Sequence, residues 1–168
     1  LVNFQEARTL FPVTENYAYL DNASTSPIPK PVFDASRNHD QERLLLGELA
    51  WDRWMKALEE TRELVAQLIH ARKEEIASTR NTSEGINIIA QGIRWKRGDS
   101  VITSSVEFPS NLYPWLRLRS RGVTVRIVRP EPDGRLSLTR LKRSIDDSTK
   151  LIAISHVQYG SGYKIDLK

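Results

Sequence analysis

Hydroxyl and amide side chains gather in one short stretch, residues 80–87, whose sequence is Arg-Asn-Thr-Ser-Glu-Gly-Ile-Asn. A β-type run at residues 76–79 precedes the stretch, and an apolar helical run at residues 86–90 follows it. This order predicts a turn that places Thr82 and Ser83 at a helix N-terminus, where free N–H groups and the helix dipole favour an anion. The stretch could therefore bind a phosphate group. An ordinary helix N-cap at Thr82 or Ser83, with no ligand, is the alternative interpretation.

Two further polar loops follow strand-like runs later in the chain. The predicted strands cover residues 100–104, 123–128 and 151–155, and the predicted helices between them cover residues 112–120, up to Gly122, and a segment capped by Ser137. Short strands that alternate with helices predict a parallel sheet with crossover helices. The loops at residues 105–111 and 155–162 come directly after strands. Ligands of open parallel sheets bind beyond the carboxyl ends of the strands, so the polar loops can converge on one ligand.

The N-terminal part of the chain is expected to be mainly helical. We expect a short helix at residues 3–10, a strand or extended arm at 17–20, a turn-rich loop at 21–27, a helix at 32–46 that breaks at Gly47, and a second, longer helix. Apolar residues recur in this second helix at helical spacing. Trp51 and Trp54 are interpreted as core or interface anchors rather than as cofactor contacts.

Composition narrows the class of protein. The 168 residues include no cysteine, which excludes disulfides, thiolate metal sites and a cysteine nucleophile within this segment and fits a reducing cytoplasm. No run approaches the roughly 20 apolar residues that a membrane span needs. The net charge of +4 comes from scattered basic residues rather than a dense patch, so a nucleic-acid partner is not expected. The chain starts at Leu1, and no closing helix precedes Lys168, which suggests part of a larger protein.

Four segments in order resemble the class V aminotransferase family of pyridoxal-phosphate enzymes, which includes the cysteine desulfurases. The segments are residues 19–25, residues 79–87, residues 107–111 with Pro114 and Trp115, and residues 155–157 with Ser161 and Gly162. The resemblance runs from about residue 17 to the end. It implies an α/β fold, the aspartate aminotransferase-like large domain of PLP fold type I, with three layers, a mainly parallel sheet and an incomplete C-terminus. Residues 1–18 would be an arm or helix, and residues 19–168 the N-terminal part of the cofactor-binding domain.

The resemblance also implies roles at the cofactor, pyridoxal 5'-phosphate. Thr82 and Ser83 would hold its phosphate, as the turn itself suggests. Phe108 falls where the family places the ring that stacks on the pyridine. Tyr159 falls where many members have an asparagine that hydrogen-bonds the phenolic oxygen, and its hydroxyl or the neighbouring Gln158 could do the same.

Substrate and assembly are implied as well. Asn22 and Ala23 lie where the family's N-terminal loop lines the substrate pocket. Family members are usually homodimers with residues of both chains in each site. The family's Schiff-base lysine and the aspartate that pairs with the pyridinium follow later than this chain reaches, so neither Lys164 nor Lys168 matches that lysine. His156 is a candidate acid–base group or a packing residue at a strand end.

Two departures bear on the reaction. Desulfurases have a histidine at the stacking position, whereas Phe108 cannot titrate, and Tyr159 replaces the usual asparagine. Both changes fit better with the branch of epimerase-like and aminotransferase-like members. The sequence therefore predicts the N-terminal part of an enzyme that acts on an amino acid by transamination, epimerisation or lyase chemistry. The alternatives are a cysteine desulfurase, or a non-catalytic module that binds a phosphorylated ligand on the same scaffold.

Overall fold

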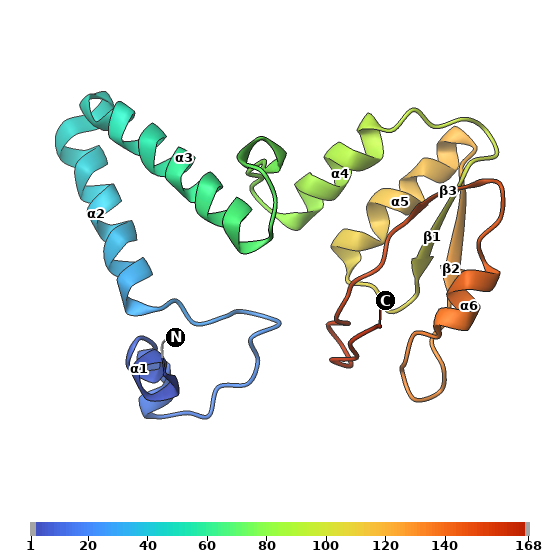
Figure 1. Cartoon of the computed structure of the whole chain (residues 1–168), viewed down its shortest axis with the longest axis horizontal. Coiled ribbons are helices and arrows are strands. Elements are labelled where there is room, and N and C mark those ends of the chain that lie inside the picture. Colours follow the sequence, from blue (N-terminus) through green and yellow to red (C-terminus); the bar gives the residue numbers. More distant parts are fainter. Residues whose placement is uncertain (1–2, 167–168) are drawn as a thin grey trace. The chain divides into compact units, whose positions relative to one another are not determined.

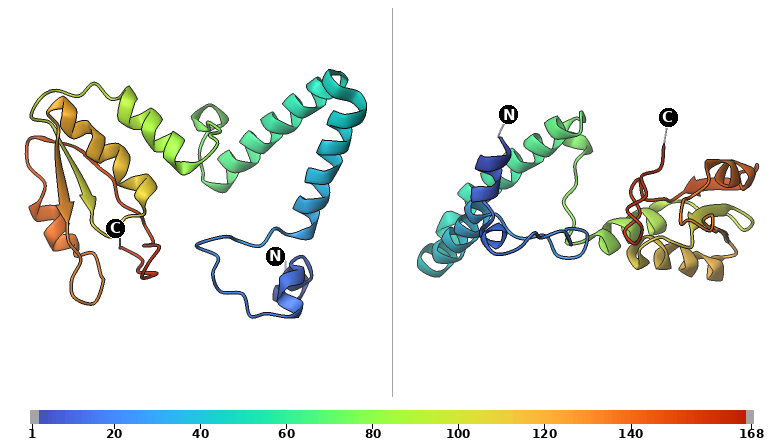
Figure 2. Two further views of the ribbon diagram at one scale, coloured as in Figure 1. Left: turned by 180° about the vertical axis from the view of Figure 1, so that it is seen from behind. Right: turned by 90° about the horizontal axis from the view of Figure 1, so that it is seen from below.

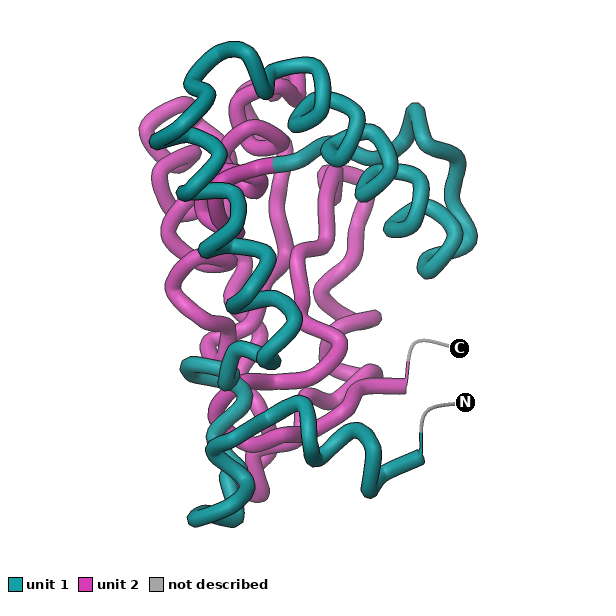
Figure 3. Tube along the Cα trace, turned by 90° about the vertical axis from the view of Figure 1, so that its left-hand side faces the viewer, with its two compact units in different colours: residues 1–78 teal, residues 79–168 magenta. Residues whose placement is uncertain are grey.

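The computed structural model describes residues 3–166 of the chain (Figure 1). Its contacts divide the chain into two compact units, one up to residue 78 and one from residue 79 onward (Figure 3). No helix within residues 3–166 combines the length and the apolar character that crossing a membrane requires. The division into an arm at residues 1–18 and a domain at residues 19–168 concerns the complete protein and stays a prediction.

The first unit is helical. Its elements are α1 (Phe4–Thr9), the 3₁₀ turn η1 (Pro12–Glu15), α2 (Lys30–Leu46), η2 (Gly47–Ala50), α3 (Trp51–Leu68) and η3 (Lys73–Glu75). Asn3 caps α1 by accepting a hydrogen bond from the Glu6 N–H at 2.8 Å. Gly47 ends α2 with φ of 51°, a value that favours glycine, as the predicted break requires. Within residues 3–166, the predicted segment at 17–20 pairs with no strand and is an extended arm.

Side chains fasten α2 to α3 across this break. The rings of His39 and Trp54 meet edge to face with centroids 4.9 Å apart, and Trp54 Nε1 donates to Glu42 Oε2 at 2.9 Å. Trp54 is therefore a packing residue between the two helices, as predicted. Trp51 lies at the start of α3 and is 55% exposed in this structure.

The second unit is an α/β layer structure. Its elements are α4 (Thr82–Gly92), β1 (Ser100–Ser104), η4 (Pro109–Asn111), α5 (Tyr113–Arg117), η5 (Leu118–Arg121), β2 (Thr124–Val128), α6 (Leu138–Arg143) and β3 (Thr149–Ile152). Within residues 3–166 the strands form one parallel sheet in the order β2-β1-β3. Every residue of the central strand β1 is buried, so this strand forms the middle of the core of the second unit.

Helices cover both faces of the sheet, as Figure 2 shows. Val101 and Ile102 are neighbours on β1, so their side chains point to opposite faces, and each is fully buried. The Val101 face packs against Ala90 of α4 and Trp115 of α5. The Ile102 face packs against Leu141 of α6. The three-layer arrangement predicted from the sequence is confirmed.

Several predicted boundaries were wrong. Within residues 3–166, the β-type run at 76–79 pairs with no strand. A strand needs a neighbour to satisfy its backbone groups, and the residue types of the run alone do not show whether one is available. Strand β3 begins at Thr149 and ends at Ile152, earlier than the apolar pattern indicated. The start of the strand was missed because Lys150 is polar. In the structure, its Nζ donates a hydrogen bond to the Arg94 carbonyl at 2.6 Å. The predicted helix at 112–120 splits into α5 and η5 and ends at Gly122 with φ of 78°.

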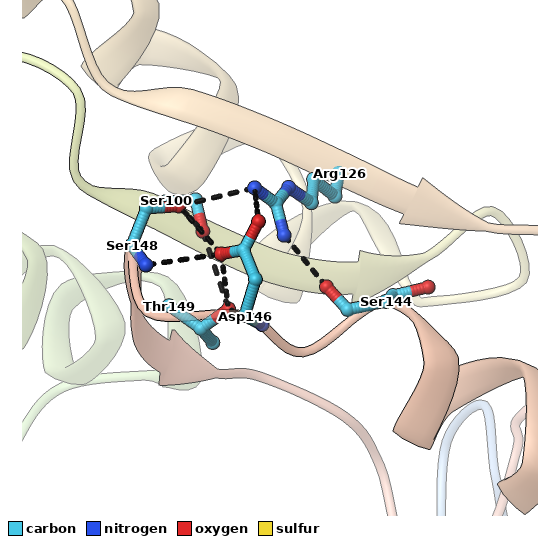
Figure 4. Close-up of polar contacts among 6 residues, drawn as sticks. All are labelled: Ser100, Arg126, Ser144, Asp146, Ser148 and Thr149. Carbon is cyan, nitrogen blue, oxygen red and sulfur yellow. Dashed lines mark hydrogen bonds and ion pairs between the residues drawn. The ribbon is translucent and has the colours of Figure 1, made fainter.

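A cluster around Arg126 of β2 joins the strands at the end opposite to the polar loops (Figure 4). Arg126 donates to the Ser144 carbonyl at 2.7 Å, to Ser148 Oγ at 3.0 Å and to the Asp146 carboxylate. Asp146 also accepts from the Ser148 N–H at 3.0 Å, and Ser148 Oγ donates to Ser100 Oγ of β1 at 3.1 Å. The cluster therefore links β2, β1 and the segment that leads into β3.

The contribution of the Asp146 carboxylate to stability should be complete above about pH 4 and be lost progressively at lower pH. Hydrogen bonds from Arg126 and Ser148 hold its pKa well below the ordinary value. The folded state therefore favours the ionised form, and this contribution disappears as pH falls below the unfolded pKa of about 4. In urea denaturation of the full-length protein, the midpoint should fall more steeply between pH 5 and 2 than it does in Asp146→Asn. Parallel pH profiles for the two proteins would contradict this role.

Candidate cofactor-binding site

The first N–H groups of α4 have no acceptor within the helix itself. Asn81, not Thr82 or Ser83, is the N-cap, and its Oδ1 accepts from the Glu84 N–H at 2.9 Å. Helix geometry gives the N–H groups of Thr82 and Ser83 no acceptor within α4. The alternative of a cap at either residue was therefore wrong. The two hydroxyl residues occupy the first turn itself, where the helix dipole favours a bound anion.

The carboxylate nearest to this turn is neutralised. Glu84 accepts from the Arg80 backbone N–H at 2.7 Å, from Arg80 Nε at 3.0 Å and from Arg80 Nη2 at 2.7 Å. The side-chain hydrogen bond from Arg80, helped by the backbone bond, lowers the pKa of Glu84. Glu84 is therefore ionised and paired, so that its charge is balanced beside the positive end of the helix.

Ser83 and Phe108 line one hollow of about 460 Å³ in the second unit. The other lining residues are Asn87, Pro109, Ser110, Tyr113, Pro114 and Arg117. The Arg117 guanidinium adds positive charge, and the Phe108 ring is about half exposed. A hollow with a helix N-terminus, an arginine and an aromatic ring is suited to a flat molecule that carries an anionic group.

Phe108 meets Tyr159 across the carboxyl ends of two neighbouring strands. Phe108 lies in the loop after β1 and Tyr159 in the loop after β3. Their rings are edge to face, with centroids 5.1 Å apart and planes at 89°. The convergence of these loops, expected from the parallel sheet, is thus present in the structure. Tyr159 is about half exposed.

Gln158 turns inward instead. Its side chain is 1% exposed, and its Nε2 donates to Glu107 Oε1 at 2.8 Å. Its backbone N–H donates to the Tyr163 carbonyl at 2.9 Å, which closes the turn that carries Tyr159. The sequence offered Gln158 as a second cofactor contact, but in this structure the amide nitrogen is committed to Glu107. The part that Tyr159 or Gln158 plays at the cofactor stays a prediction.

Sequence reasoning missed the buried carboxylate of Glu107, which is 4% exposed. Its Oε1 accepts from the Ser155 N–H at 2.7 Å and from Gln158 Nε2 at 2.8 Å. Its Oε2 accepts from Ser155 Oγ at 2.6 Å and from Asn111 Nδ2 at 2.9 Å. Burial raises the pKa of Glu107, but these hydrogen bonds outweigh it and leave the pKa below its usual value. An acidic residue directly before a predicted site residue was the available signal.

Of the predicted cofactor residues, Ser83 and Phe108 line this hollow, whereas Thr82, Tyr159 and Gln158 do not. The remaining candidates also lie outside it. Asn22 lines a separate hollow of about 290 Å³ in the first unit, and Ala23 is exposed beside it. The part that these two play in substrate binding stays a prediction. His156 is exposed, and its carbonyl accepts from the Ile165 N–H at 2.9 Å. Lys164 is exposed and pairs through its backbone with Val157, and Lys168 lies outside the described residues.

Curated relatives match nearly the whole chain. The chain is 39% identical over 168 residues to a "Probable cysteine desulfurase" of Methanothermobacter thermautotrophicus, covering 98% of this chain and 42% of that protein. It is 34% identical to a "Probable cysteine desulfurase" of Pyrococcus abyssi, covering 94% of this chain and 41% of the relative. It is also 30% identical to an uncharacterized Schizosaccharomyces pombe protein, covering 99% of this chain and 34% of that protein. The chain thus spans about two fifths of the length of the two desulfurase relatives.

Solved structures agree with these matches. The cysteine desulfurase CsdA of Escherichia coli superimposes with a TM-score of 0.82 at 28% identity, over 99% of this chain and 44% of that one. The C-DES protein, solved with glycine linked to its PLP cofactor, gives a TM-score of 0.85 at 20% identity, over 95% of this chain and 43% of that one. These neighbours confirm the PLP fold type I expected from the sequence.

The family model described as "Aminotransferase class-V" matches residues 18–168. The match covers the turn at α4, the loop of Phe108 and the loop of Tyr159. It confirms the family, and with it the cofactor, that the four sequence segments implied. The chain belongs to the class V aminotransferases, whose cofactor is pyridoxal 5'-phosphate.

Proposed function

We propose that the full-length protein is a pyridoxal-phosphate enzyme that acts on an amino acid, and that residues 79–168 hold the cofactor. The observation that carries the proposal is the single hollow lined by Ser83 and Phe108. The first-turn N–H and hydroxyl groups of Thr82 and Ser83 are suited to the phosphate. The Phe108 ring supplies a flat apolar surface for the pyridine.

The donor set fits such a cofactor. A phosphate dianion requires hydrogen-bond donors and positive potential, which the α4 N-terminus and Arg117 supply. The pairing of Glu84 with Arg80 removes the repulsion that a free carboxylate beside the phosphate would cause. Charge and shape at this end of the sheet therefore both favour the group.

The residues of this segment orient the cofactor rather than transfer its protons. When bound, pyridoxal phosphate supplies an electron sink for the carbanion formed from an amino acid. Thr82 and Ser83 would hold the phosphate, and the Phe108 ring would fix the plane of the pyridine and exclude water from one face. The Tyr159 hydroxyl would donate a hydrogen bond to the phenolic oxygen. In the family, the lysine used for covalent attachment lies later in the sequence than the segment that this chain matches.

Titration of the cofactor-free full-length protein with pyridoxal phosphate tests the proposal. We expect saturable binding with a visible absorbance band displaced from that of the free cofactor, and turnover of at least one amino acid in a panel. Absence of any spectral change at saturating cofactor would refute the proposal that the protein is a pyridoxal-phosphate enzyme. Binding without turnover of any amino acid would instead support a non-catalytic module.

Cysteine desulfurase is the second candidate, because the two curated relatives at 39% and 34% identity carry that name. The absence of a titratable group at Phe108 argues against it. Sulfide release from L-cysteine by the full-length protein would favour the desulfurase. A faster reaction with another amino acid, with no sulfide released from cysteine, would favour the transamination, epimerisation or lyase reading.

Phe108→Ala should weaken cofactor binding about tenfold or more. The lost stacking surface is worth about 1–3 kcal/mol in comparable aromatic contacts, and each 1.4 kcal/mol is about tenfold in affinity. Phe108→His keeps a flat ring and should bind nearly as tightly as the unaltered protein. Dissociation constants from absorbance titration of the full-length variants check this ranking. Equal affinity for the alanine and histidine variants would show that the ring does not stack on the cofactor.

We further propose a homodimer. The first unit exposes large apolar side chains near the α2–α3 break, including Leu44, Leu45, Leu49 and Trp51. Such a patch is typical of a surface that another chain covers. Light scattering of the full-length protein should give twice the monomer mass, and a monomeric mass at micromolar concentration would contradict the proposal.

A cytoplasmic location is proposed on the absence of cysteine from all 168 residues. Cysteine-free segments need no oxidising compartment for folding. Fractionation of cells that express the full-length protein should place it in the cytoplasmic fraction, and its recovery from the exported or membrane fraction would contradict the location.

A further inference from the structure

Glu107 fastens the two loops that carry the aromatic pair. Its own loop follows β1 and includes Asn111, whereas Ser155 and Gln158 belong to the segment after β3, about fifty residues later in the chain. Each carboxylate oxygen accepts two hydrogen bonds, and the carboxylate is buried. Three of the four donors, two on Ser155 and one on Gln158, belong to the later segment, so the carboxylate ties the two loops together.

The hydrogen bonds lie directly behind the ring contact. Phe108 is the residue after Glu107, and Tyr159 is the residue after Gln158. Two neighbouring contacts therefore join the same two segments: the Glu107–Gln158 hydrogen bond of 2.8 Å and the Phe108–Tyr159 ring contact with centroids 5.1 Å apart. Both residues are more than half exposed, at 51% and 55%, so burial alone does not fix the positions of their rings.

We propose that Glu107 is a positioning residue that sets the place of the Phe108 ring and the Tyr159 hydroxyl through this network. Glu107 itself is buried and does not line the hollow of Ser83 and Phe108. The expected effect of Glu107 on cofactor affinity rests on the proposed function. The expected effect on the positions of the Phe108 and Tyr159 rings does not, and it can be measured without cofactor.

Glu107→Gln is the sharpest variant, because it keeps the side-chain volume and changes only the acceptors. An amide nitrogen at Oε1 would face the Ser155 backbone N–H, which cannot accept a hydrogen bond. At Oε2 it would face the Asn111 amide nitrogen, whose Oδ1 already accepts from Trp115 Nε1 at 3.1 Å, while Ser155 Oγ could accept from it. Either orientation sets one donor against another and removes the negative charge that strengthens all four hydrogen bonds, so the two loops are held less tightly.

Asp146→Asn is the matched control. Asp146 is also a carboxylate that accepts several hydrogen bonds and joins strands, but it lies at the opposite end of the sheet. A merely structural role for Glu107 predicts that both variants lose thermal stability and nothing else. A positioning role predicts that only Glu107→Gln alters the ring pair and the cofactor.

Two measurements on the full-length protein decide between these roles. In crystals of cofactor-free Glu107→Gln, the Phe108–Tyr159 edge-to-face contact should be lost, whereas Asp146→Asn should retain it. In titration with pyridoxal phosphate, Glu107→Gln should bind on the order of tenfold to a hundredfold more weakly and show altered visible circular dichroism, and Asp146→Asn should change neither. An intact ring contact with unaltered cofactor affinity in Glu107→Gln would overturn the inference.

Two milder variants keep the test open if Glu107→Gln does not fold. Ser155→Ala removes one hydroxyl donor, and Gln158→Met removes the amide donor at similar size. Gln158→Met should shift Tyr159, with a smaller loss of cofactor affinity than Glu107→Gln would give. An unmoved Tyr159 in both variants would refute the positioning role. Failure of the unaltered protein to bind cofactor would refute the proposed function, but the crystallographic comparison would still test the ring geometry.

Discussion

Ser83→Asp should abolish cofactor binding by the full-length protein and leave its fold intact. An added carboxylate about 4 Å from the phosphate costs about 4 kcal/mol for each pair of unit charges near a protein surface, which is about a thousandfold in affinity. An acidic residue in the first turn of a helix is favourable for the helix itself. The affinity loss should therefore come without a fall in the melting temperature of the cofactor-free protein.

Ser83→Asn separates charge from size in this experiment. Asparagine has the shape of aspartate but carries no charge, so this variant should retain cofactor binding to within about tenfold, the loss of one hydrogen bond. Dissociation constants come from absorbance titration, and melting temperatures from circular dichroism of the cofactor-free proteins. If the aspartate and asparagine variants bind alike, the phosphate does not lie at Ser83.

Trp115→Ala should give the largest loss of stability in the second unit. Trp115 is 3% exposed and packs with Val101 and Leu118 in the core between the sheet and its helices. Truncation of a buried tryptophan costs about 3–5 kcal/mol. Since domains are stable by only about 5–15 kcal/mol, the loss would remove a large part of the total.

Two further variants show where this energy comes from. Trp115→Phe keeps an aromatic ring but removes the N–H that donates to Asn111 Oδ1 at 3.1 Å, and should cost about 1–3 kcal/mol. Arg117→Ala, an exposed change on the same helix, should stay within about 0.5 kcal/mol. Urea denaturation of the full-length variants gives the three values. A cost below about 1 kcal/mol for Trp115→Ala would contradict its place in the core.

Patterns of apolar residues predicted the sheet because they report burial directly. Strand β1 was predicted with its observed limits, since Val101 and Ile102 face the two cores on either side of it. Strand β3 was misplaced because Thr149 and Lys150 are polar, and Lys150 pairs with Asp99 at the edge of the sheet. Local hydrophobicity cannot show that a long charged side chain lies along a strand and reaches a partner far away in sequence.

The site was predictable to the extent that it follows from strand order. Parallel strands bring their carboxyl ends to one edge, so the loops of Phe108 and Tyr159 had to approach each other. The role of Glu107 was not predictable in this way, because its hydrogen bonds come from residues about fifty positions away. A buried acid resembles an exposed loop acid in sequence, and only the fold shows that its donors surround it.

The orientation of Gln158 illustrates the same limit. Tyr159 and Gln158 are adjacent, so either could have faced the cofactor. The inward turn of Gln158 toward Glu107 leaves Tyr159 on the outside of the loop. Side-chain direction in a loop depends on which buried group needs a partner, and the sequence alone does not show that need.

A crystal structure of the full-length protein with pyridoxal phosphate is the most direct test of the site. We expect the phosphate within hydrogen-bonding distance of the Thr82 and Ser83 N–H groups and the pyridine stacked on the Phe108 ring. A phosphate bound away from the N-terminus of α4, or a pyridine that does not touch Phe108, would contradict the assignment.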